Sequence, residues 1–419
     1  MFCNQCEETA KGFGCTVRGV CGKDEEAAGL QDILIYTLKG LSTRNLAAMK
    51  AGGGNPDAGK FVAGCLFATL TNVNFDPARL RDMINEAARI RDALPPAGST
   101  EPAACTWAPA SPAAIAAKAQ EIVAAREAVD PDLQSLRDLL VYGLKGLGAY
   151  YHHAAILGYE DEEITVFMQE ALAATLQELS VGDMVGHVLA CGEVGVKVLA
   201  LLDTANTTAY GTPAITTVRT TAGARPGILV TGHDLKDLAD LLEQARGAGV
   251  DVYTHGEMLP AHAYPDLRKY DHLVGNYGGS WPFQREEFER FNGPVLVTTN
   301  CLVPPKDSYR DRVYTTGLVG YAGLKHIDAS PDGKKDFSTL IEHAKRCKAP
   351  EDISRGDLVT GCAHAPVLAL ADTVIDAVKT GAVKRFLVMA GCDGRYGGRD
   401  YYTRFAKALP ADTVILTAG

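Results

Sequence analysis

The spacing of apolar residues changes near residue 222, and this change constrains the fold more than any other feature of the sequence. Before it, LQDILIYTLKGL (30–41) and LRDLLVYGLKGLGAYYHHAAIL (136–157) carry apolar residues at i, i+3, i+4 and i+7, which is the period of a helix. After residue 226, short apolar runs alternate with amphipathic segments, as in PGILVTGHDL (226–235), LKDLADLLEQARGAG (235–249) and VDVYTHGEM (250–258). The sequence therefore predicts a helical N-terminal domain followed by α/β structure with a parallel sheet.

The helical half contains an internal repeat. Leu30, Asp32, Leu34, Tyr36, Leu38, Lys39, Gly40 and Leu41 recur 106 residues later as Leu136, Asp138, Leu140, Tyr142, Leu144, Lys145, Gly146 and Leu147. FVAGCLFATL (61–70) and FMQEALAATL (167–176) keep the same offset. Unrelated amphipathic helices also share Leu and Ala, but the common Tyr-x-Leu-Lys-Gly-Leu favours a duplicated unit. We predict two related bundles, 24–100 and 130–205, joined by the Pro- and Ala-rich stretch 95–112.

The α/β half is interrupted by a break flanked by Gly and Pro near 349–360. A helix in CAHAPVLALADTVIDAVKTG and strands in KRFLVMAGCDG and TVILTAG follow this break. Two α/β units in succession are therefore expected. The resulting division is a loop at 1–23, a helical domain at 24–221, a first α/β domain at 222–358 and the start of a second at 359–419.

Composition excludes several classes of function. The formal charge of −10 disfavours nucleic acid as a partner. We expect no apolar stretch to approach the ~20 residues that cross a bilayer, and therefore no membrane partner. The first 30 residues lack the apolar region of a signal peptide. These features predict a cytoplasmic protein, in which clustered cysteines are metal ligands before they are disulfides.

Four of the 11 cysteines, Cys3, Cys6, Cys15 and Cys21, lie within the first 22 residues. The spacing C-x2-C-x8-C-x5-C is interspersed with glycines, which allow a loop to turn sharply and bring four thiolates together. Zinc usually takes its thiolates from two CxxC pairs, and only the first pair here is CxxC. A compact single loop favours a [4Fe–4S] cluster over zinc, with an accidental cluster of cysteines as the third alternative.

A second set of residues follows four predicted strands. His233, Glu257, Cys301 and Cys392 each come just after the carboxyl end of a strand, at the sheet edge where open α/β folds place their ligands. This mixture of hard and soft ligands suits a redox metal centre. Taken singly, the histidine is as well explained by a hydrogen-bonded turn and each cysteine by simple packing. Both interpretations stay open at this point.

The chain closely resembles the hybrid-cluster protein (prismane) family, the hydroxylamine reductases, over essentially its whole length. The tight cysteine spacing is similar to that of the short-spaced, anaerobe-type subgroup. The resemblance is carried by MFCNQCEETAKGFGCTVRGVCGK, GILVTGHDLKDL, GVDVYTHGEMLPAHAYP, VGNYGGSW, VTTNCLVPP, DRVYTTGLVGY and VMAGCDGRYGGRDYYT.

This resemblance implies a fold and two cofactors. The implied fold is a helical domain of two three-helix bundles followed by two Rossmann-like α/β domains, the second incomplete here. A [4Fe–4S] cluster is implied at Cys3, Cys6, Cys15 and Cys21. A hybrid [4Fe–2O–2S] cluster is implied with His233, Glu257, Cys301 and Cys392 among its ligands, and with Cys392 at the position that carries a persulfide sulfur.

The implied activity is the two-electron reduction of hydroxylamine to ammonia and water, with nitric oxide as an alternative substrate and nitrosative stress as the context. An external protein would donate single electrons to the N-terminal cluster. Glu257 and His255 are the candidates for supplying protons, since they lie beside each other in the sequence at the strand end.

Family members continue beyond the last strand with a Cys-Gly/Ala-Lys, a Gly-Gln-Cys-Asn and a Trp-Tyr-Glu-Gln-Lys motif, which supply further ligands. These motifs are absent from this sequence, so we expect a chain that is truncated at its C-terminus. The alternative function is a non-catalytic fragment or electron-transfer scaffold that carries only the N-terminal cluster. A zinc-stabilised binding module is a third hypothesis.

Overall fold

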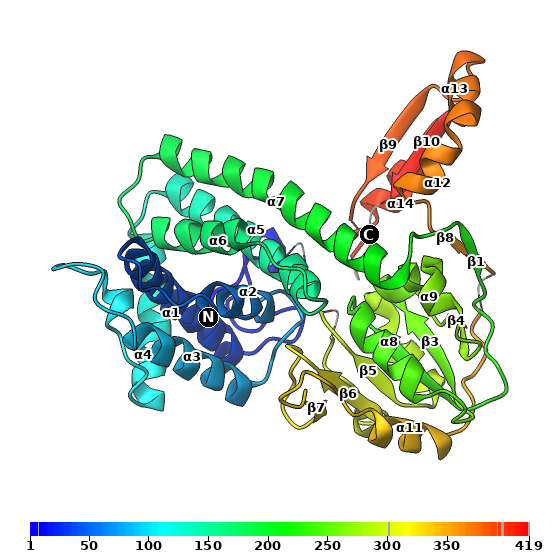
Figure 1. The fold of residues 1–419 in the computed structure, drawn as a ribbon, viewed down its shortest axis with the longest axis horizontal. Helices are drawn as coiled ribbons and strands as arrows, with labels where there is room; N and C mark the ends of the chain where they lie inside the picture. Colours follow the sequence, from blue (N-terminus) through cyan, green and yellow to red (C-terminus); the bar gives the residue numbers. More distant parts are fainter. Residues whose placement is uncertain (7, 301, 355, 392, 395–397, 418–419) are drawn as a thin grey trace. The chain divides into compact units, whose positions relative to one another are not determined.

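The computed structural model describes residues 1–419 except 7, 301, 355, 392, 395–397 and 418–419. The chain divides into two compact units, which are described one by one. The first comprises 1–209, 297–304 and 313–335, and the second comprises 210–296, 305–312 and 336–419. Figure 1 shows helices in the N-terminal half and strands with helices after it, so the predicted fold class is confirmed. The four-domain division made from the sequence stays a prediction.

The first unit is built mainly of helices whose starts are fixed by side-chain caps. Asp24, Asp76, Ser111, Asp130 and Asp161 each accept a hydrogen bond from a backbone amide in the first turn of a helix. The helices, in chain order, are α1 (Glu25–Lys50), α2 (Ala58–Ala68), α3 (Pro77–Asp92), α4 (Pro112–Glu127), α5 (Pro131–Ala155), α6 (Glu162–Ala174) and α7 (Val181–Tyr210).

The predicted repeat reappears as a repeated order of helices. Helices α1 and α5 begin at residues 25 and 131, which keeps the offset of 106, and their capping residues Asp24 and Asp130 keep it too. Each long helix is followed by a short one, α2 or α6, and then by α3 or α7. The matching sequences thus fold into matching helices.

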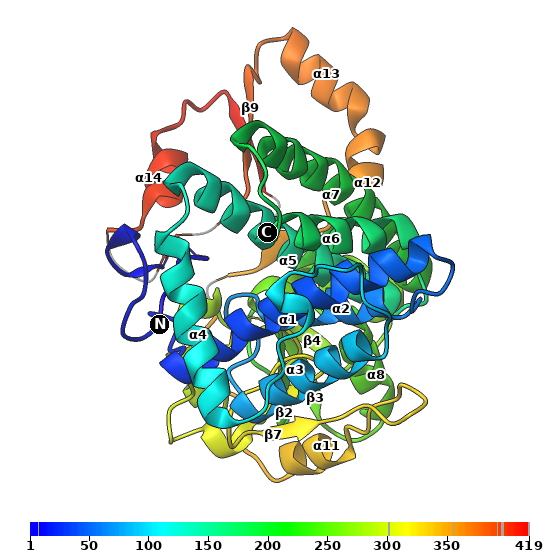
Figure 2. The same cartoon turned by 90° about the vertical axis from the view of Figure 1, so that its left-hand side faces the viewer.

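Close contacts of the helices in this unit depend on two glycines. A Cβ on Gly148 of α5 would lie 2.7 Å from the carbonyl oxygen of Ala63 in α2. A Cβ on Gly40 of α1 would lie 2.0 Å from the carbonyl oxygen of Ala104, in the short helix η2 (Ala103–Cys105). Helices α3 and α4 also pack on α1, as Figure 2 shows. Backbones therefore approach each other where no side chain larger than hydrogen fits.

Two features of this unit differ from the sequence analysis. Helix α4 lies between the two predicted bundles, where no helix was predicted, and its Ala-rich composition explains its helix formation. The expectation that no apolar stretch approaches a bilayer-spanning length is wrong. Helix α7 is long and apolar enough by length and composition, and only 11% of its most apolar window is buried.

A six-stranded sheet has the order β4-β3-β2-β5-β6-β7. The pairs β2–β3, β3–β4 and β6–β7 are parallel, as the alternating pattern predicted. The strands are β2 (Gly227–Thr231), β3 (Asp251–His255), β4 (Leu273–Asn276), β5 (Val295–Val297), β6 (Val313–Thr316) and β7 (Lys325–Ile327). Accompanying helices are α8 (Leu235–Gln244), η3 (Gly256–Ala263), α9 (Pro265–Arg268), η4 (Trp281–Phe283), α10 (Gln284–Phe291), η5 (Arg310–Arg312) and α11 (Ser338–Lys345).

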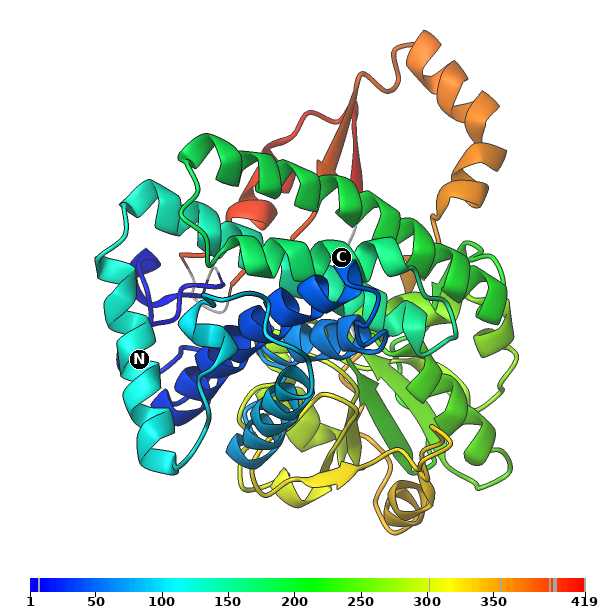
Figure 3. The ribbon, with the colours of Figure 1, turned by 60° about the vertical axis from the view of Figure 1, so that its left-hand side comes forward.

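The remaining strands form two small sheets. β1 (Thr216–Val218) pairs antiparallel with β8 (Leu358–Thr360). β9 (Arg385–Met389) pairs in parallel with β10 (Thr413–Thr417), and α14 (Tyr401–Ala408) connects them (Figure 3). The single helix expected after Cys362 is divided into α12 (His364–Ala369) and α13 (Ala371–Lys379). Cys362, just before α12, is exposed.

Candidate functional site

The N-terminal loop brings its cysteines together by folding back on itself. Cys3 and Cys15 form an isolated antiparallel bridge, in which the Cys3 N–H donates to the Cys15 carbonyl at 3.1 Å and the reverse bond measures 2.8 Å. The amide of Ala10 donates to the Cys15 sulfur at 3.5 Å. All four cysteines are free thiols. The loop therefore folds back so that Cys3 and Cys15 lie opposite each other, whereas the shared site of all four cysteines stays a prediction.

Glycine is required where the loop ends. Gly22 has a φ of +100°, and a Cβ at this position would lie 2.3 Å from the ring of Pro304. An L-residue would meet both an unfavourable backbone conformation and a steric clash. The loop thus returns to α1 at a position that only glycine accommodates.

The four sulfurs influence one another electrostatically. Burial raises the pKa of Cys6, and the charges of Cys21, Cys3 and Cys15 raise it further. Burial also raises the pKa of Cys21, and the charges of Cys3 and Cys15 add to this effect. The backbone hydrogen bond and the charge of Lys23 lower the pKa of Cys21 and so oppose it. Several thiolates this close are unstable without a counter-charge, and bound iron would supply one.

The loop has the residue types of an iron–sulfur site. Each iron of a [4Fe–4S] cluster would bind one cysteine thiolate, and the loop contains four free cysteines. In the described part of the chain, no group of three or more His, Cys, Asp or Glu side chains is placed to hold one metal ion.

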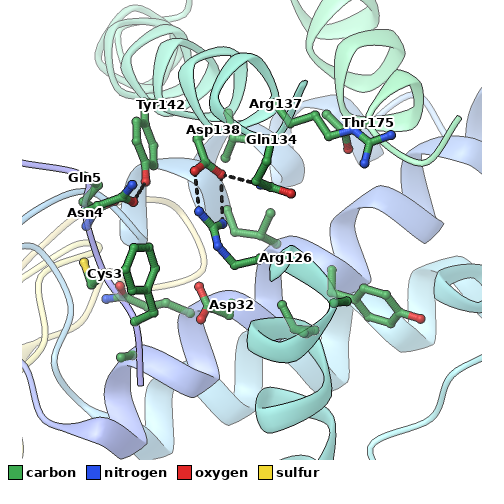
Figure 4. Close-up of a pocket in the computed structure, with 18 of the residues that line it drawn as sticks. Cys3, Asn4, Gln5, Asp32, Arg126, Gln134, Arg137, Asp138, Tyr142 and Thr175 are labelled. Atoms are coloured by element: carbon green, nitrogen blue, oxygen red, sulfur yellow. Dashed lines mark hydrogen bonds and ion pairs between the residues drawn. The ribbon is translucent and has the colours of Figure 1, made fainter. Parts of the chain in front are cut away.

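Side chains of the helical unit hold the loop in place. Tyr142 of α5 hydrogen-bonds through its hydroxyl to Asn4 (Figure 4). The Lys145 ammonium donates to Gln5 at 2.7 Å. The buried Lys23 donates to Gln31 of α1 and lies 3.9 Å from the sulfur of Cys3. A positive charge beside a thiolate stabilises the charged form of the ligand.

A cavity of about 270 Å³ lies behind the loop, and both copies of the repeat line it. Asp32, Tyr36 and Lys39 of α1 and the corresponding Asp138, Tyr142 and Lys145 of α5 all border this space. In the α5 copy, the Asp138 carboxylate is hydrogen-bonded. It accepts two hydrogen bonds from Arg126 and one from Gln134 at 2.9 Å (Figure 4). The shared Asp, Tyr and Lys of the repeat are therefore residues of one common polar cavity.

Burial disfavours charge in this cavity. Burial raises the pKa of Asp32, and the charge of Lys145 opposes this shift. Burial lowers the pKa of Lys145 to about 7, and the charge of Lys23 lowers it further. Burial also lowers the pKa of Lys39 to about 8, and the charge of Arg137 adds to this shift. The cavity thus contains groups that can change protonation near neutral pH.

The second predicted set begins at the adjacent strands β2 and β3. Thr231 pairs in register with His255, so the residues that follow the two strands are also neighbours. Gly232 and Gly256, with φ of +114° and +57°, turn the chain at each strand end. His233 and Glu257 come next, and the imidazole Nε2 hydrogen-bonds directly to the Glu257 carboxylate. Parallel register thus brings together two residues that lie 24 apart in the sequence.

His233 and Glu257 are joined by one direct hydrogen bond. The hydrogen bond to His233 lowers the pKa of Glu257, and burial opposes this effect. Imidazole nitrogen and carboxylate oxygen are both ligands that iron accepts. Cys301 and Cys392, the sulfur members of the predicted set, lie outside the described residues.

Both ring nitrogens of His255 have hydrogen-bond partners inside the protein. Its side chain is 1% exposed, with Nδ1 at 3.1 Å from the Thr231 hydroxyl and Nε2 at 3.0 Å from Glu287 Oε2. The other oxygen of Glu287 accepts a hydrogen bond from the Gly279 amide at 3.0 Å. This geometry holds the end of β3 and the Gly-rich loop after β4 together, and it suits positioning more than proton delivery.

Sequence reasoning missed several of these residues. Glu287 gave no signal, because a buried acid on an amphipathic helix cannot be told from an exposed one by pattern alone. Asn4 and Gln5 lie between ligands and were not considered. The cavity could have been found, since Asp32, Tyr36 and Lys39 were already seen to recur in the second copy of the repeat.

The chain matches the Prismane/CO dehydrogenase family over residues 1–419. A match of this extent, with a cysteine loop that fits an iron–sulfur cluster, defines the class of protein as an iron–sulfur oxidoreductase. The chain belongs to the Prismane/CO dehydrogenase family.

Several named relatives are similar over the whole chain. It is 56% identical over 427 residues to a protein named hydroxylamine reductase from Thermoanaerobacter pseudethanolicus, and 54% identical over 422 residues to one of that name from Chlorobaculum tepidum. Each alignment covers 100% of this chain and 78% of the relative. Among solved structures, carbon monoxide dehydrogenase IV from Carboxydothermus hydrogenoformans aligns with 100% of this chain and 68% of its own, at 15% identity and a TM-score of 0.47.

Proposed function

We propose that this protein catalyses the two-electron reduction of hydroxylamine, in which NH2OH, two electrons and two protons give ammonia and water. The observation that carries the proposal is the identity of more than half of all aligned residues to relatives named hydroxylamine reductase, across the whole chain. Nitric oxide is the alternative substrate within the same proposal.

The proposed cofactors are a [4Fe–4S] cluster at Cys3, Cys6, Cys15 and Cys21 and a hybrid iron–sulfur–oxygen cluster at the strand-end set. When bound, such clusters supply one-electron transfer and iron sites that coordinate a nitrogen or oxygen ligand. The raised pKa values of Cys6 and Cys21, due first to burial and then to the neighbouring loop cysteines, support the first assignment, because bound iron would offset both effects. The direct contact of His233 with Glu257 supports the second, in which Cys301 and Cys392 would be the sulfur ligands.

The residues around these sites have distinct proposed roles. The ammonium of Lys23, 3.9 Å from the Cys3 sulfur, stabilises negative charge on that ligand. Glu257 is the candidate for holding a proton at its carboxylate oxygen, where the hydrogen bond to His233 favours the charged form that can accept one. His255 keeps the β3 end in position through Thr231 and Glu287.

The second candidate function is an electron-transfer scaffold with the N-terminal cluster alone. It is favoured by the position of Cys3, Cys6, Cys15 and Cys21, which all lie within the first 22 residues and need no residue of the strand ends to form a site. A scaffold of this kind would accept and release single electrons and would not turn over hydroxylamine.

Anaerobic preparation of residues 1–419 tests both candidates. The reductase should contain about eight irons and produce ammonia from hydroxylamine with reduced methyl viologen, whereas the scaffold should contain about four irons and no activity. Cys6→Ser should remove about four irons and the cluster absorbance. Cys362→Ser, which alters an exposed thiol, is the matched control and should change neither. A colourless protein with bound zinc would contradict both candidates.

A further inference from the structure

The loop that holds the four cysteines exposes two apolar side chains. Phe13 and Val17 are 71% and 86% exposed, and they flank Cys15, which is 4% exposed, by two residues on either side. Such exposure of large apolar groups has a cost in water unless a partner covers them. We define the loop patch as four exposed residues, Lys11, Phe13, Val17 and Arg18.

Phe13, the aromatic residue of the loop patch, packs against a neighbouring ring. Lys11 and Gly12 have φ of +58° and +68°, and this left-handed turn leads directly into Phe13. The Phe13 ring packs edge-to-face on Phe2, with centroids 5.7 Å apart. The Arg126 guanidinium lies 5.1 Å from the Phe2 ring centroid. A side chain fixed in this way loses little entropy when a partner binds it.

The charge of the loop patch is opposite to that of the chain. Residues 9–22 contain two cations, Lys11 and Arg18, and no acid, although the whole chain has a net charge of −10. Both cations are exposed, and neither forms an ion pair within the part of the chain that the structure describes. Glu7 and Glu8 precede this window, so the cationic character belongs to Lys11 and Arg18 themselves. Two exposed cations on an acidic protein offer a local contact for a negatively charged partner.

We propose that the loop patch is the docking surface for a small acidic protein that carries one electron. The proposal rests on the proposed function, because it takes the four cysteines as the ligands of a redox cluster. A small apolar centre with a charged rim suits the weak, short-lived complexes of electron transfer, which bury little surface. Docking here would place the partner's cofactor over the segment that contains Cys15.

The test measures electron transfer from two donors into the same cluster. The anaerobic chain is mixed in a stopped-flow instrument with a reduced plant-type [2Fe–2S] ferredoxin, an acidic protein, or with reduced methyl viologen, a small cation. We expect the ferredoxin rate constant to fall as salt is added. Lys11→Glu with Arg18→Glu should lower it by about tenfold or more at low salt and flatten its salt dependence. The methyl viologen rate should stay within about twofold, since it needs no docking surface.

Further variants separate the apolar and charged contributions. Phe13→Ser with Val17→Ser should lower the ferredoxin rate while keeping its salt dependence. Lys50→Glu with Lys348→Glu changes the net charge equally at exposed positions outside the loop and should behave as the unaltered chain. Rates are compared per cluster after iron counting, and Lys11→Gln with Arg18→Gln replaces the glutamate pair if that pair lowers the iron content.

Three outcomes would overturn the proposal. Equal effects of the loop and control charge reversals would exclude a local docking surface. A dimer that becomes a monomer when Phe13 and Val17 are changed would make the patch an interface between copies of the chain. Binding to anionic vesicles that these variants abolish would make it a lipid contact. Loss of hydroxylamine turnover with methyl viologen would instead contradict the proposed function, so the two failures are distinguishable.

Discussion

The N-terminal loop and the strand-end site bring their proposed metal ligands together in different ways. In the loop, four cysteines lie within 22 residues, an antiparallel bridge pairs Cys3 with Cys15, and Gly22 ends the loop at a position that only glycine accommodates. At the strand ends, His233 and Glu257 meet because Thr231 and His255 are in register on parallel strands. The first arrangement depends on local chain geometry, whereas the second depends on the formation of a sheet.

This difference teaches where each site is vulnerable. The loop needs backbone freedom at its turns and anchors on the helical unit, such as the Lys145–Gln5 hydrogen bond. The strand-end site needs the sheet edge to stay in place, and Glu287 holds two of its loops with one carboxylate. Substitutions at these positions should therefore affect the two regions separately.

The largest effect is expected at Glu287. Glu287→Ala removes two hydrogen bonds and leaves buried polar groups of His255 and Gly279 without this acceptor, which should cost about 2–4 kcal/mol in the unfolding of the α/β unit. Glu287→Gln keeps an acceptor and a donor of the same shape and should cost less than half as much. Urea denaturation followed by circular dichroism measures both. Equal costs for Ala and Gln would contradict the bridging role.

A smaller effect is expected at Gly22. Gly22→Ala meets both the +100° φ and the Pro304 ring, so it should destabilise the loop by about 2 kcal/mol or more and lower the bound iron. Gly12→Ala is the matched control, because Gly12 has a φ of +68° and a Cβ at that position would meet nothing within 4 Å. This control should cost only about 1 kcal/mol, from the backbone conformation alone. Iron content and thermal unfolding compare the two, and a Gly12 effect as large as that of Gly22 would exclude the Pro304 contact as the cause.

The smallest effect is a pH dependence from the cavity behind the loop. The pKa of Lys39, lowered to about 8 by burial, lies below its unfolded value, so the unfolded chain binds more protons between pH 8 and about 10.5. This group therefore favours folding more as the pH rises through that window. Since the cavity can hold water that screens the charge, we expect only about 1–2 kcal/mol.

Lys39→Met should remove this contribution. The variant's advantage over the unaltered chain, measured by urea denaturation at about pH 7.5 and about pH 10, should shrink as the pH rises. Lys50→Met changes an exposed lysine and should show no such trend. A constant difference between Lys39→Met and the unaltered chain at both pH values would contradict a buried, shifted lysine.

The sequence by itself determined the elements that depend on local pattern. Helical periodicity and the 106-residue offset identified α1 and α5, and strand composition identified β2 and β3 with His233 and Glu257 just beyond them. These inferences succeeded because the side chains of a helix or strand repeat with a fixed period, and parallel strands end at a common edge. The cysteine loop was evident because its residues are close in the sequence.

Only the tertiary structure decided which side chains are buried and which residues they contact. It turned the repeated Asp32 and Asp138 toward one cavity, buried Glu287 between His255 and Gly279, and enclosed the His255 ring that the sequence offered for proton transfer. It also left Phe13 and Val17 exposed, although both are apolar residues that a pattern would assign to the core. Local sequence cannot encode these outcomes, since burial and hydrogen-bond partners depend on segments far apart in the chain that meet only after folding.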